Sequence, residues 1–103
     1  MTFELTTARG IYRLALAREA ENLPEATLLT LSLERLDGIE KVVLQCRIDT
    51  TLVAGLDSRE VLSRLARWIE RDFEMTRENA LKSIRSERKL LVIALDASNP
   101  GPF

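Results

Sequence analysis

The chain has 103 residues and a formal net charge of −1, with apolar residues at 46% and charged residues at 30%. These values are typical of a soluble domain with one hydrophobic core. The chain contains no histidine, which excludes Ser-His and Cys-His mechanisms and any metal site that needs a histidine ligand. Its single cysteine excludes an intrachain disulfide, so a reducing cytoplasm is the expected compartment. No apolar run reaches the roughly 18 residues of a transmembrane helix, and no membrane partner is expected.

The N-terminal quarter predicts a short strand followed by a helix. Residues 2–5 alternate apolar and polar side chains, as a half-buried strand does. A hydroxyl of Thr6 or Thr7 can cap a helix that runs to about Asn22, and Pro24 ends it. The apolar stripe of this helix would contain Ala8, Ile11, Tyr12 and Ala15. A strand over residues 11–16 is the alternative.

Residues 27–49 carry the clearest local pattern. Two runs of alternating apolar and polar residues flank Asp37-Gly38, a pair that favours a type I′ turn because both central positions need positive φ. A two-residue turn there pairs residues whose numbers sum to 75. The predicted pairs are Leu33 with Val42, Leu31 with Leu44, Leu29 with Cys46, and Glu34 with Lys41. This register places apolar against apolar and acid against base, so we predict a β-hairpin.

A long amphipathic segment follows a connection over residues 50–56, in which Gly55 is the expected flexible point. Asp57 is a good N-cap, and Glu60 completes a variant of the capping box. Apolar residues then recur at three- and four-residue steps, which predicts a helix over residues 58–88. Residues 89–96 form an apolar, β-branched run that predicts a final, mostly buried strand.

The length of the predicted helix has a consequence. Thirty-one helical residues span roughly 46 Å, whereas a domain of this size has a diameter of roughly 35 Å. Either the helix breaks near Met75-Thr76, where Thr76 can cap a second helix, or its end packs on another subunit. The dimer is slightly favoured over the break.

The expected fold is therefore α+β, with one domain over residues 1–96 and a flexible C-terminal tail over residues 97–103. The helices would pack on one face of a small sheet. With residues 2–5 as a strand, the element order is βαββαβ, which resembles the ferredoxin-like arrangement. This resemblance concerns architecture alone and implies no function.

We predict a small cytoplasmic protein–protein interaction module, most simply a homodimer, with no cofactor. An oversized amphipathic helix and the lack of a catalytic constellation support this hypothesis. The predicted interface residues are Leu62, Trp68, Phe73, Met75, Leu81 and Ile84.

Two other functional classes are alternatives. A nucleic-acid-binding module would use a basic helix face, with phosphate contacts from Arg77, Lys82, Arg85, Arg88 and Lys89. No aromatic residues are interleaved there for base stacking, so the helix dipole and solubility explain these charges better. An enzyme that needs no histidine ranks third, and a pocket lined by Asp49, Glu70 or Arg71 would favour it.

Two further groups have simple structural interpretations. Cys46 occupies an inward position of its strand and is expected to be a small core residue rather than a reactive thiol. Glu70, Asp72 and Glu74 have arginines at helical spacing, so an ion-paired, solvated face is favoured over a cation site.

Overall fold

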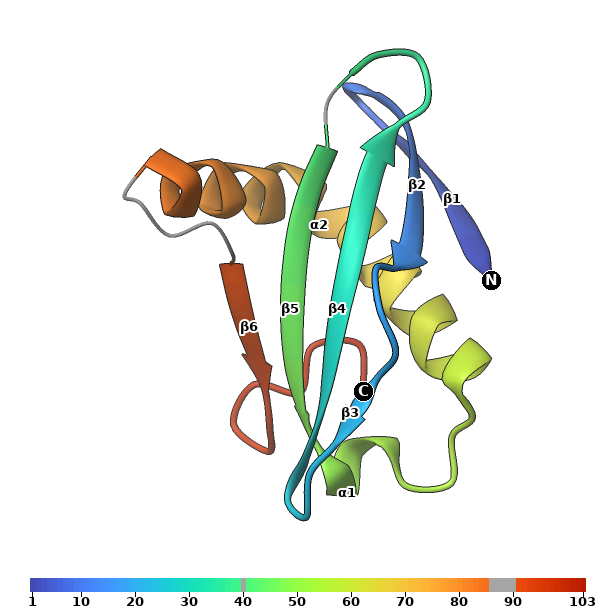
Figure 1. The fold of residues 1–103 in the computed structure, drawn as a ribbon, viewed down its shortest axis with the longest axis vertical. Coiled ribbons are helices and arrows are strands. Elements are labelled where there is room, and N and C mark those ends of the chain that lie inside the picture. The colour runs from blue at the N-terminus through green and yellow to red at the C-terminus, as the bar shows by residue number, and fades with distance from the viewer. Residues whose placement is uncertain (40, 86–90) are drawn as a thin grey trace.

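The computed structural model describes residues 1–39, 41–85 and 91–103, and the side chains of residues 1–39, 41–72 and 93–103. Within these ranges the chain forms six strands and two helices (Figure 1). The strands are β1 (Thr2–Thr7), β2 (Gly10–Leu16), β3 (Glu21–Asn22), β4 (Ala26–Arg35), β5 (Lys41–Asp49) and β6 (Leu91–Leu95). The helices are α1 (Thr50–Val53) and α2 (Ser58–Arg85).

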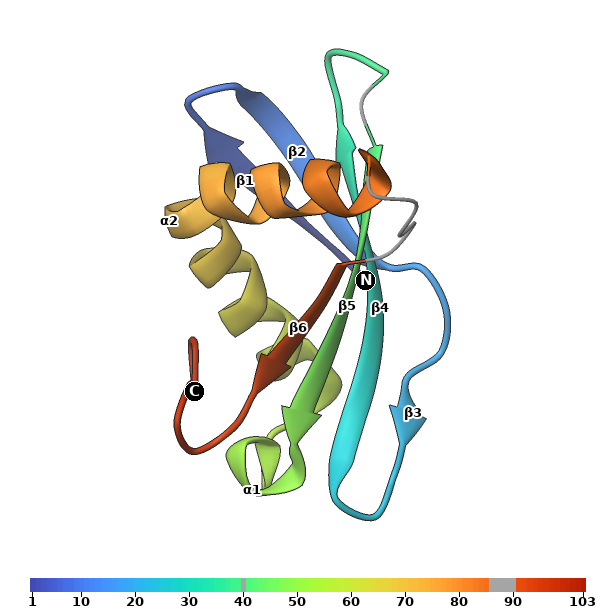
Figure 2. The ribbon, with the colours of Figure 1, turned by 90° about the vertical axis from the view of Figure 1, so that its left-hand side faces the viewer.

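The strands form one mixed sheet in the order β1-β2-β4-β5-β6, and the short β3 pairs with the far end of β4. All neighbours are antiparallel except β5 and β6, which are parallel. A parallel pair needs a crossover connection, and α1 and α2 provide it. Figure 2 shows α2 against one face of the sheet, with β3 displaced toward the other side. The α+β class is therefore confirmed.

The central hairpin has the predicted register. Leu33 pairs with Val42, Leu31 with Leu44, and Glu34 with Lys41. The type I′ turn is wrong, because among the described glycines positive φ occurs at Gly10, Gly55 and Gly101 but not at Gly38. The N–H of Leu36 donates to the carbonyl of Ile11 at 2.9 Å. This end of β4 thus continues along β2 as far as Leu36 before the chain turns.

The helix predicted from residue 7 to residue 22 is wrong. This segment instead contains β2 and β3, and Tyr12 and Leu14 are buried while Arg13 between them is exposed. The Thr7 hydroxyl accepts the N–H of Arg9 at 3.2 Å and donates to the carbonyl of Gly10 at 2.9 Å. It therefore closes a tight turn instead of capping a helix. Gly10 has a φ of 138°, a conformation that favours glycine.

The predicted order βαββαβ is not what the structure has, because the first helix is replaced by strands. β2 pairs with both β1 and β4, so its backbone groups are satisfied by long-range neighbours. The ferredoxin-like arrangement is not confirmed for the same reason. The connection predicted over residues 50–56 also contains the short helix α1, which Asp49 caps through the N–H of Thr51 at 3.0 Å.

Helix α2 begins as predicted and changes direction before its end. The Asp57 carboxylate accepts the N–H of Glu60 at 2.8 Å, which confirms the cap. Asp72 is non-helical, with φ −110° and ψ 21°, so the helix does break, before the Met75-Thr76 position that was the alternative to packing on another subunit. Aspartate is a weak helix former and tolerates this conformation. Figures 1 and 2 show the second part of α2 running across the strands instead of continuing the first part.

One hydrophobic core lies between the sheet and the first part of α2. The helix contributes Val61, Leu62, Leu65, Ala66 and Ile69. The sheet contributes Leu5, Tyr12, Leu14, Leu29, Leu31, Leu33, Val42, Leu44, Cys46, Ile48 and Leu95. The interior position predicted for Cys46 is therefore confirmed.

The predicted final strand is confirmed as β6, at the edge of the sheet beside β5. Of its described side chains, Leu95 is buried, Ile93 is partly buried and Ala94 is exposed, as an edge position allows. After β6 the chain turns back, because the Asp96 carboxylate accepts N–H groups of Ser98 and Asn99 at 2.9 and 3.0 Å. Phe103 then packs against the core. The flexibility expected for residues 97–103 stays a prediction.

Candidate functional site

The face of the sheet that points away from α2 is one candidate surface. Strand side chains alternate between the two faces, so the residues between the core positions of β1, β2, β4 and β5 lie on this outer face. Direct cross-strand neighbours share a face. The outer face therefore has rows of side chains that cross the strands and can be read from the register.

Three such rows lie next to one another. The apolar row consists of Ile11 and Leu36, which are 44% and 42% exposed. The charged row follows the register from Glu4 to Arg13, Glu34 and Lys41, all of them exposed. The small row consists of Thr2, Ala15, Ser32 and Val43. The charged row alternates in sign across four strands.

Further along the strands, part of the outer face is covered by the chain itself. The Nε of Arg18 donates to the hydroxyl of Thr30 at 3.0 Å, and Thr30 is only 8% exposed. Ala26 is buried beside the turn in which the N–H of Leu23 donates to the Ala26 carbonyl. Arg47 of β5 remains exposed beyond these residues and pairs with Glu25 at 3.3 Å, so the three rows and the loop beside them form one open part of the outer face. A hollow of about 420 Å³ in that loop is bordered by Glu34, Leu36 and the fully exposed Ile39.

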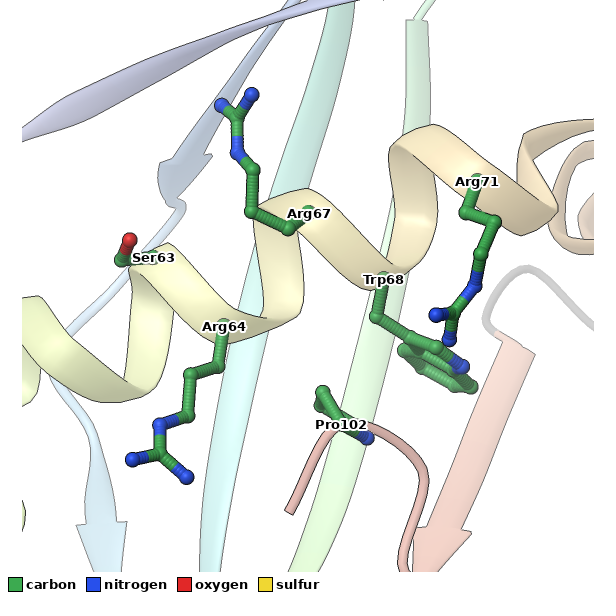
Figure 3. A pocket seen from close by; sticks show the side chains of 6 residues that line it. All are labelled: Ser63, Arg64, Arg67, Trp68, Arg71 and Pro102. Carbon is green, nitrogen blue, oxygen red and sulfur yellow. The ribbon is translucent and has the colours of Figure 1, made fainter.

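A second candidate is a pocket of about 270 Å³ on the opposite layer of the molecule. We call it the arginine pocket, and it is lined by Ser63, Arg64, Arg67, Trp68, Arg71 and Pro102 (Figure 3). Helix α2 supplies all of these except Pro102, which the C-terminal segment places opposite Trp68. Arg64, Trp68 and Arg71 are spaced by four and three residues, so they form one stripe of the helix.

The three arginines of the pocket have different partners. Arg67 donates to the Glu70 carboxylate at 3.1 Å and to the Glu4 carbonyl at 3.1 Å, so it fastens α2 to β1. Figure 3 shows it pointing away from Trp68 and Pro102. Arg64 pairs through Nε with Glu60 at 3.0 Å, and Arg71 pairs through Nε with Asp72 at 3.6 Å. In both of these pairs the closest approach to the carboxylate is made by Nε.

A third candidate is a more enclosed apolar cavity of about 150 Å³ near the start of α2. Its walls are mainly Leu16, Leu29, Val53, Leu56, Val61 and Leu62. Polar groups are confined to Asn22, Thr27 and Ser58, and the Thr27 hydroxyl lies 3.4 Å from the Asn22 carboxamide oxygen. This volume is below the usual range of roughly 300–1,000 Å³ for ligand sites. The cavity therefore offers space for a few atoms and no charged anchor.

The structure separates the residues predicted for the interface. Leu62 is 1% exposed and belongs to the core, whereas Trp68 is partly buried and lines the arginine pocket. Phe73, Met75, Leu81 and Ile84 have side chains outside the described residues. The same holds for the predicted phosphate contacts Arg77, Lys82 and Arg85, while Arg88 and Lys89 lie outside the described backbone as well. An interface along α2 and a nucleic-acid face at its end stay predictions.

The residues named for a histidine-free enzyme do not line a common pocket. Asp49 caps α1, and its pKa is held below its usual range first by the N–H of Thr51. Glu70 accepts the Thr6 N–H at 2.9 Å and pairs with Arg67, as the interpretation of an ion-paired face predicted. Arg71 does line a pocket, but that lining contains no carboxylate. Over the described residues, no three potential metal ligands come together.

Neither surface could be predicted from the sequence, for identifiable reasons. The charged row joins residues from four strands, so it depends on the sheet order, and the spacing of residues 10–16 also suits a helix. The arginine pocket needs Pro102, whose segment has the composition of a flexible tail. The signal that could have found it was the spacing of Arg64, Trp68 and Arg71 on one stripe of α2.

In the described part of the chain, no helix has the length and apolar character that crossing a membrane requires. We compared the chain with protein-family models, curated proteins and solved structures, and none of them matches it.

Proposed function

We propose that this protein is a small protein–protein interaction module that self-associates through the outer face of its sheet. The observation that supports the proposal is the alternating charge of Glu4, Arg13, Glu34 and Lys41 across four neighbouring strands. A row with an even number of charges of alternating sign is complementary to a second copy of itself that runs in the opposite order. A two-fold axis reverses it, and two-fold dimers are the commonest homo-oligomers.

The geometry of such a dimer follows from the register. The axis would run parallel to the strands and pass between β2 and β4. Arg13 then faces Glu34 of the second copy, and Glu4 faces Lys41 of the second copy. In the apolar row, Ile11 meets Leu36, and in the small row Ala15 meets Ser32. Each row thus lies opposite the same row of the second copy, at the same height along the strands. This is the aligned packing that two sheets commonly adopt.

The small row permits close approach of the two sheets at one end of this interface. Ala15, Ser32 and Val43 are partly buried already and have short side chains. Packed sheets lie about 10 Å apart, a distance that the short side chains of this row and the longer side chains of the adjacent charged row can fill together. Charge complementarity chiefly determines specificity and orientation, so the apolar and small rows would supply most of the affinity.

The interface would be small and the association weak. Four strands at about 4.8 Å spacing give a width of roughly 14 Å between the outer strand axes. A patch of that width falls short of the about 800 Å² per partner in a standard interface. We therefore expect a concentration-dependent equilibrium with a dissociation constant in the range of roughly 10 μM to 1 mM.

Sedimentation velocity over that concentration range tests the proposal. Arg13→Glu should shift the protein to monomer, because like charges placed opposite each other cost several kcal/mol. The charge swap Arg13→Glu with Glu34→Arg should restore the dimer, since each new acid again faces a new base. Arg59→Glu is the matched control: Arg59 is exposed on the first turn of α2, away from the outer face. The proposal fails if the wild type stays monomeric throughout, or if Arg13→Glu dimerises as well as Arg59→Glu.

A further inference from the structure

The arginine pocket has features that are independent of self-association. It lies on α2 and the C-terminal segment, on the layer opposite the outer face, so a second copy seated on the sheet leaves it open. Its described lining carries three arginines and no acidic side chain. Side chains of Arg64 and Arg71 are 41% and 72% exposed.

The two outward-facing arginines keep much of their donor capacity. A guanidinium has five N–H donors, of which Nε carries one. Arg64 donates to Glu60 through Nε, and the ion pair of Arg71 with Asp72 is also closest at Nε, so the four N–H donors on the terminal nitrogens of each side chain lie outside these contacts. Terminal nitrogens in this arrangement are suited to carboxylate oxygens. Arg67 differs, because its terminal nitrogens already bind Glu70 and the Glu4 carbonyl.

An apolar floor lies between these two cations. Trp68 is partly buried against the core, and Pro102 lies opposite it (Figure 3). Gly101 positions this segment: its φ is 55°, and a Cβ there would lie 2.8 Å from Leu95 Cδ2 and 3.6 Å from Trp68 Cε2. Only glycine lets the backbone come this close. Tryptophan and arginine are also the side chains that most often carry the energy of protein interfaces.

We infer that the arginine pocket binds an extended acidic peptide segment of a partner protein. Arg64 and Arg71 are seven residues apart, so their Cα atoms are separated by roughly 10.5 Å along the helix. In an extended peptide of the polyproline II type, which has three residues per turn, two side chains three residues apart point to the same side and are separated by roughly 9.3 Å. A segment with carboxylates at that spacing reaches both arginines, and the apolar residues between them cover Trp68 and Pro102.

The openness of the pocket favours a peptide over a small molecule. Small-molecule sites are concave and bury most of the ligand, whereas this pocket has exposed arginines along one side of a helix. A peptide instead contacts the stripe along its length. Binding is expected to weaken with added salt, because exposed charge pairs are screened.

Trp68 supplies the readout, since it is the one tryptophan of the chain. The probe is a blocked heptapeptide with two aspartates three residues apart and leucine and proline between them. We expect a saturable change in Trp68 fluorescence on the wild-type protein. Two control peptides, one with asparagines in place of the aspartates and one with the two aspartates adjacent, should each bind at least about tenfold more weakly.

Protein variants complete the test. Arg64→Gln and Arg71→Gln should each weaken binding about tenfold, whereas Arg59→Gln, an exposed arginine outside the pocket, should leave it unchanged. Arg64→Glu with Arg71→Glu should bind the corresponding peptide with lysines in place of the aspartates. The inference is overturned if the acidic and the asparagine peptides bind alike, if neither binds, or if Arg59→Gln weakens binding as much as Arg71→Gln. None of these results depends on whether the chain dimerises.

Discussion

At the scale of single residues, Cys46 shows how position controls reactivity. It lies between Leu29 on β4 and Ile93 on β6 in the sheet register and is fully buried. Burial raises the pKa of the Cys46 thiol to about 12. A thiol that stays protonated is a poor nucleophile, so the lone cysteine of this chain behaves as a small apolar residue.

This burial predicts both slow labelling and a loss of stability in alkali. An unfolded thiol ionises near pH 8.5, whereas the folded thiol ionises near pH 12. The protonated Cys46 thiol therefore makes its full contribution to the free energy of unfolding below about pH 8.5, and this contribution is lost as the pH rises toward 12. Labelling by a thiol reagent at pH 8 should be much slower in the folded protein than in urea. The control is Cys46→Ala with Ala97→Cys, since position 97 is exposed; equal labelling rates would contradict the prediction.

At the scale of elements, local side-chain bonds decide where the helices begin. Asp49 starts α1 and Asp57 starts α2, each by accepting a backbone N–H two or three residues later. Glu60 does not return a bond to complete the capping box, because its carboxylate is held by Arg64 at 3.0 Å. The start of α2 therefore depends on one carboxylate.

Replacing that carboxylate gives a measurable prediction. Asp57→Ala should lower the free energy of unfolding by about 1 kcal/mol, because the N–H of Glu60 loses its partner. Asp57→Asn keeps an oxygen acceptor of the same shape and should change it by only a few tenths of a kcal/mol. Urea denaturation of the three proteins measures the difference. Equal midpoints for Asp57→Ala and the wild type would show that the cap has no role in stability.

At the scale of the whole molecule, one core joins elements from both ends of the chain. Residues of β1, β2, β4, β5 and β6 meet the first part of α2 in a single cluster. The radius of gyration is 13.1 Å and the longest dimension is 37 Å. A straight helix over Ser58–Arg85 would span roughly 42 Å, which exceeds this dimension, and the kink at Asp72 shortens the reach of α2.

A single core predicts cooperative unfolding. Leu44 is fully buried on β5 and pairs with Leu31. Leu44→Ala should lower the free energy of unfolding by about 2–5 kcal/mol, because apolar burial is lost and a cavity remains. Trp68 fluorescence and far-UV circular dichroism should still report the same transition. Val43→Ala on the outer face should lower the free energy of unfolding by less than Leu44→Ala does, when both are measured at concentrations where the chain is monomeric. Two separate transitions would show that the core is divided.

The sequence by itself determined the features that depend on local chemistry or on one close pairing. The alternation on either side of Asp37-Gly38 was sufficient for the whole register of β4 and β5. Asp57 and Glu60 marked the start of α2, and the β-branched run marked β6. Each of these signals is contained within a short stretch of chain.

The tertiary structure alone decided the features that depend on distant partners. Residues 10–16 form a strand because β1 and β4 satisfy both of its edges, although their apolar spacing also suits a helix. Gly38 departs from the turn its neighbours favour, at an end of β4 where the N–H of Leu36 donates to the carbonyl of Ile11 on β2. The charged row and the arginine pocket arise in the same way. Their residues are separated in sequence and become neighbours only when the order of the strands and the return of the C-terminal segment are set.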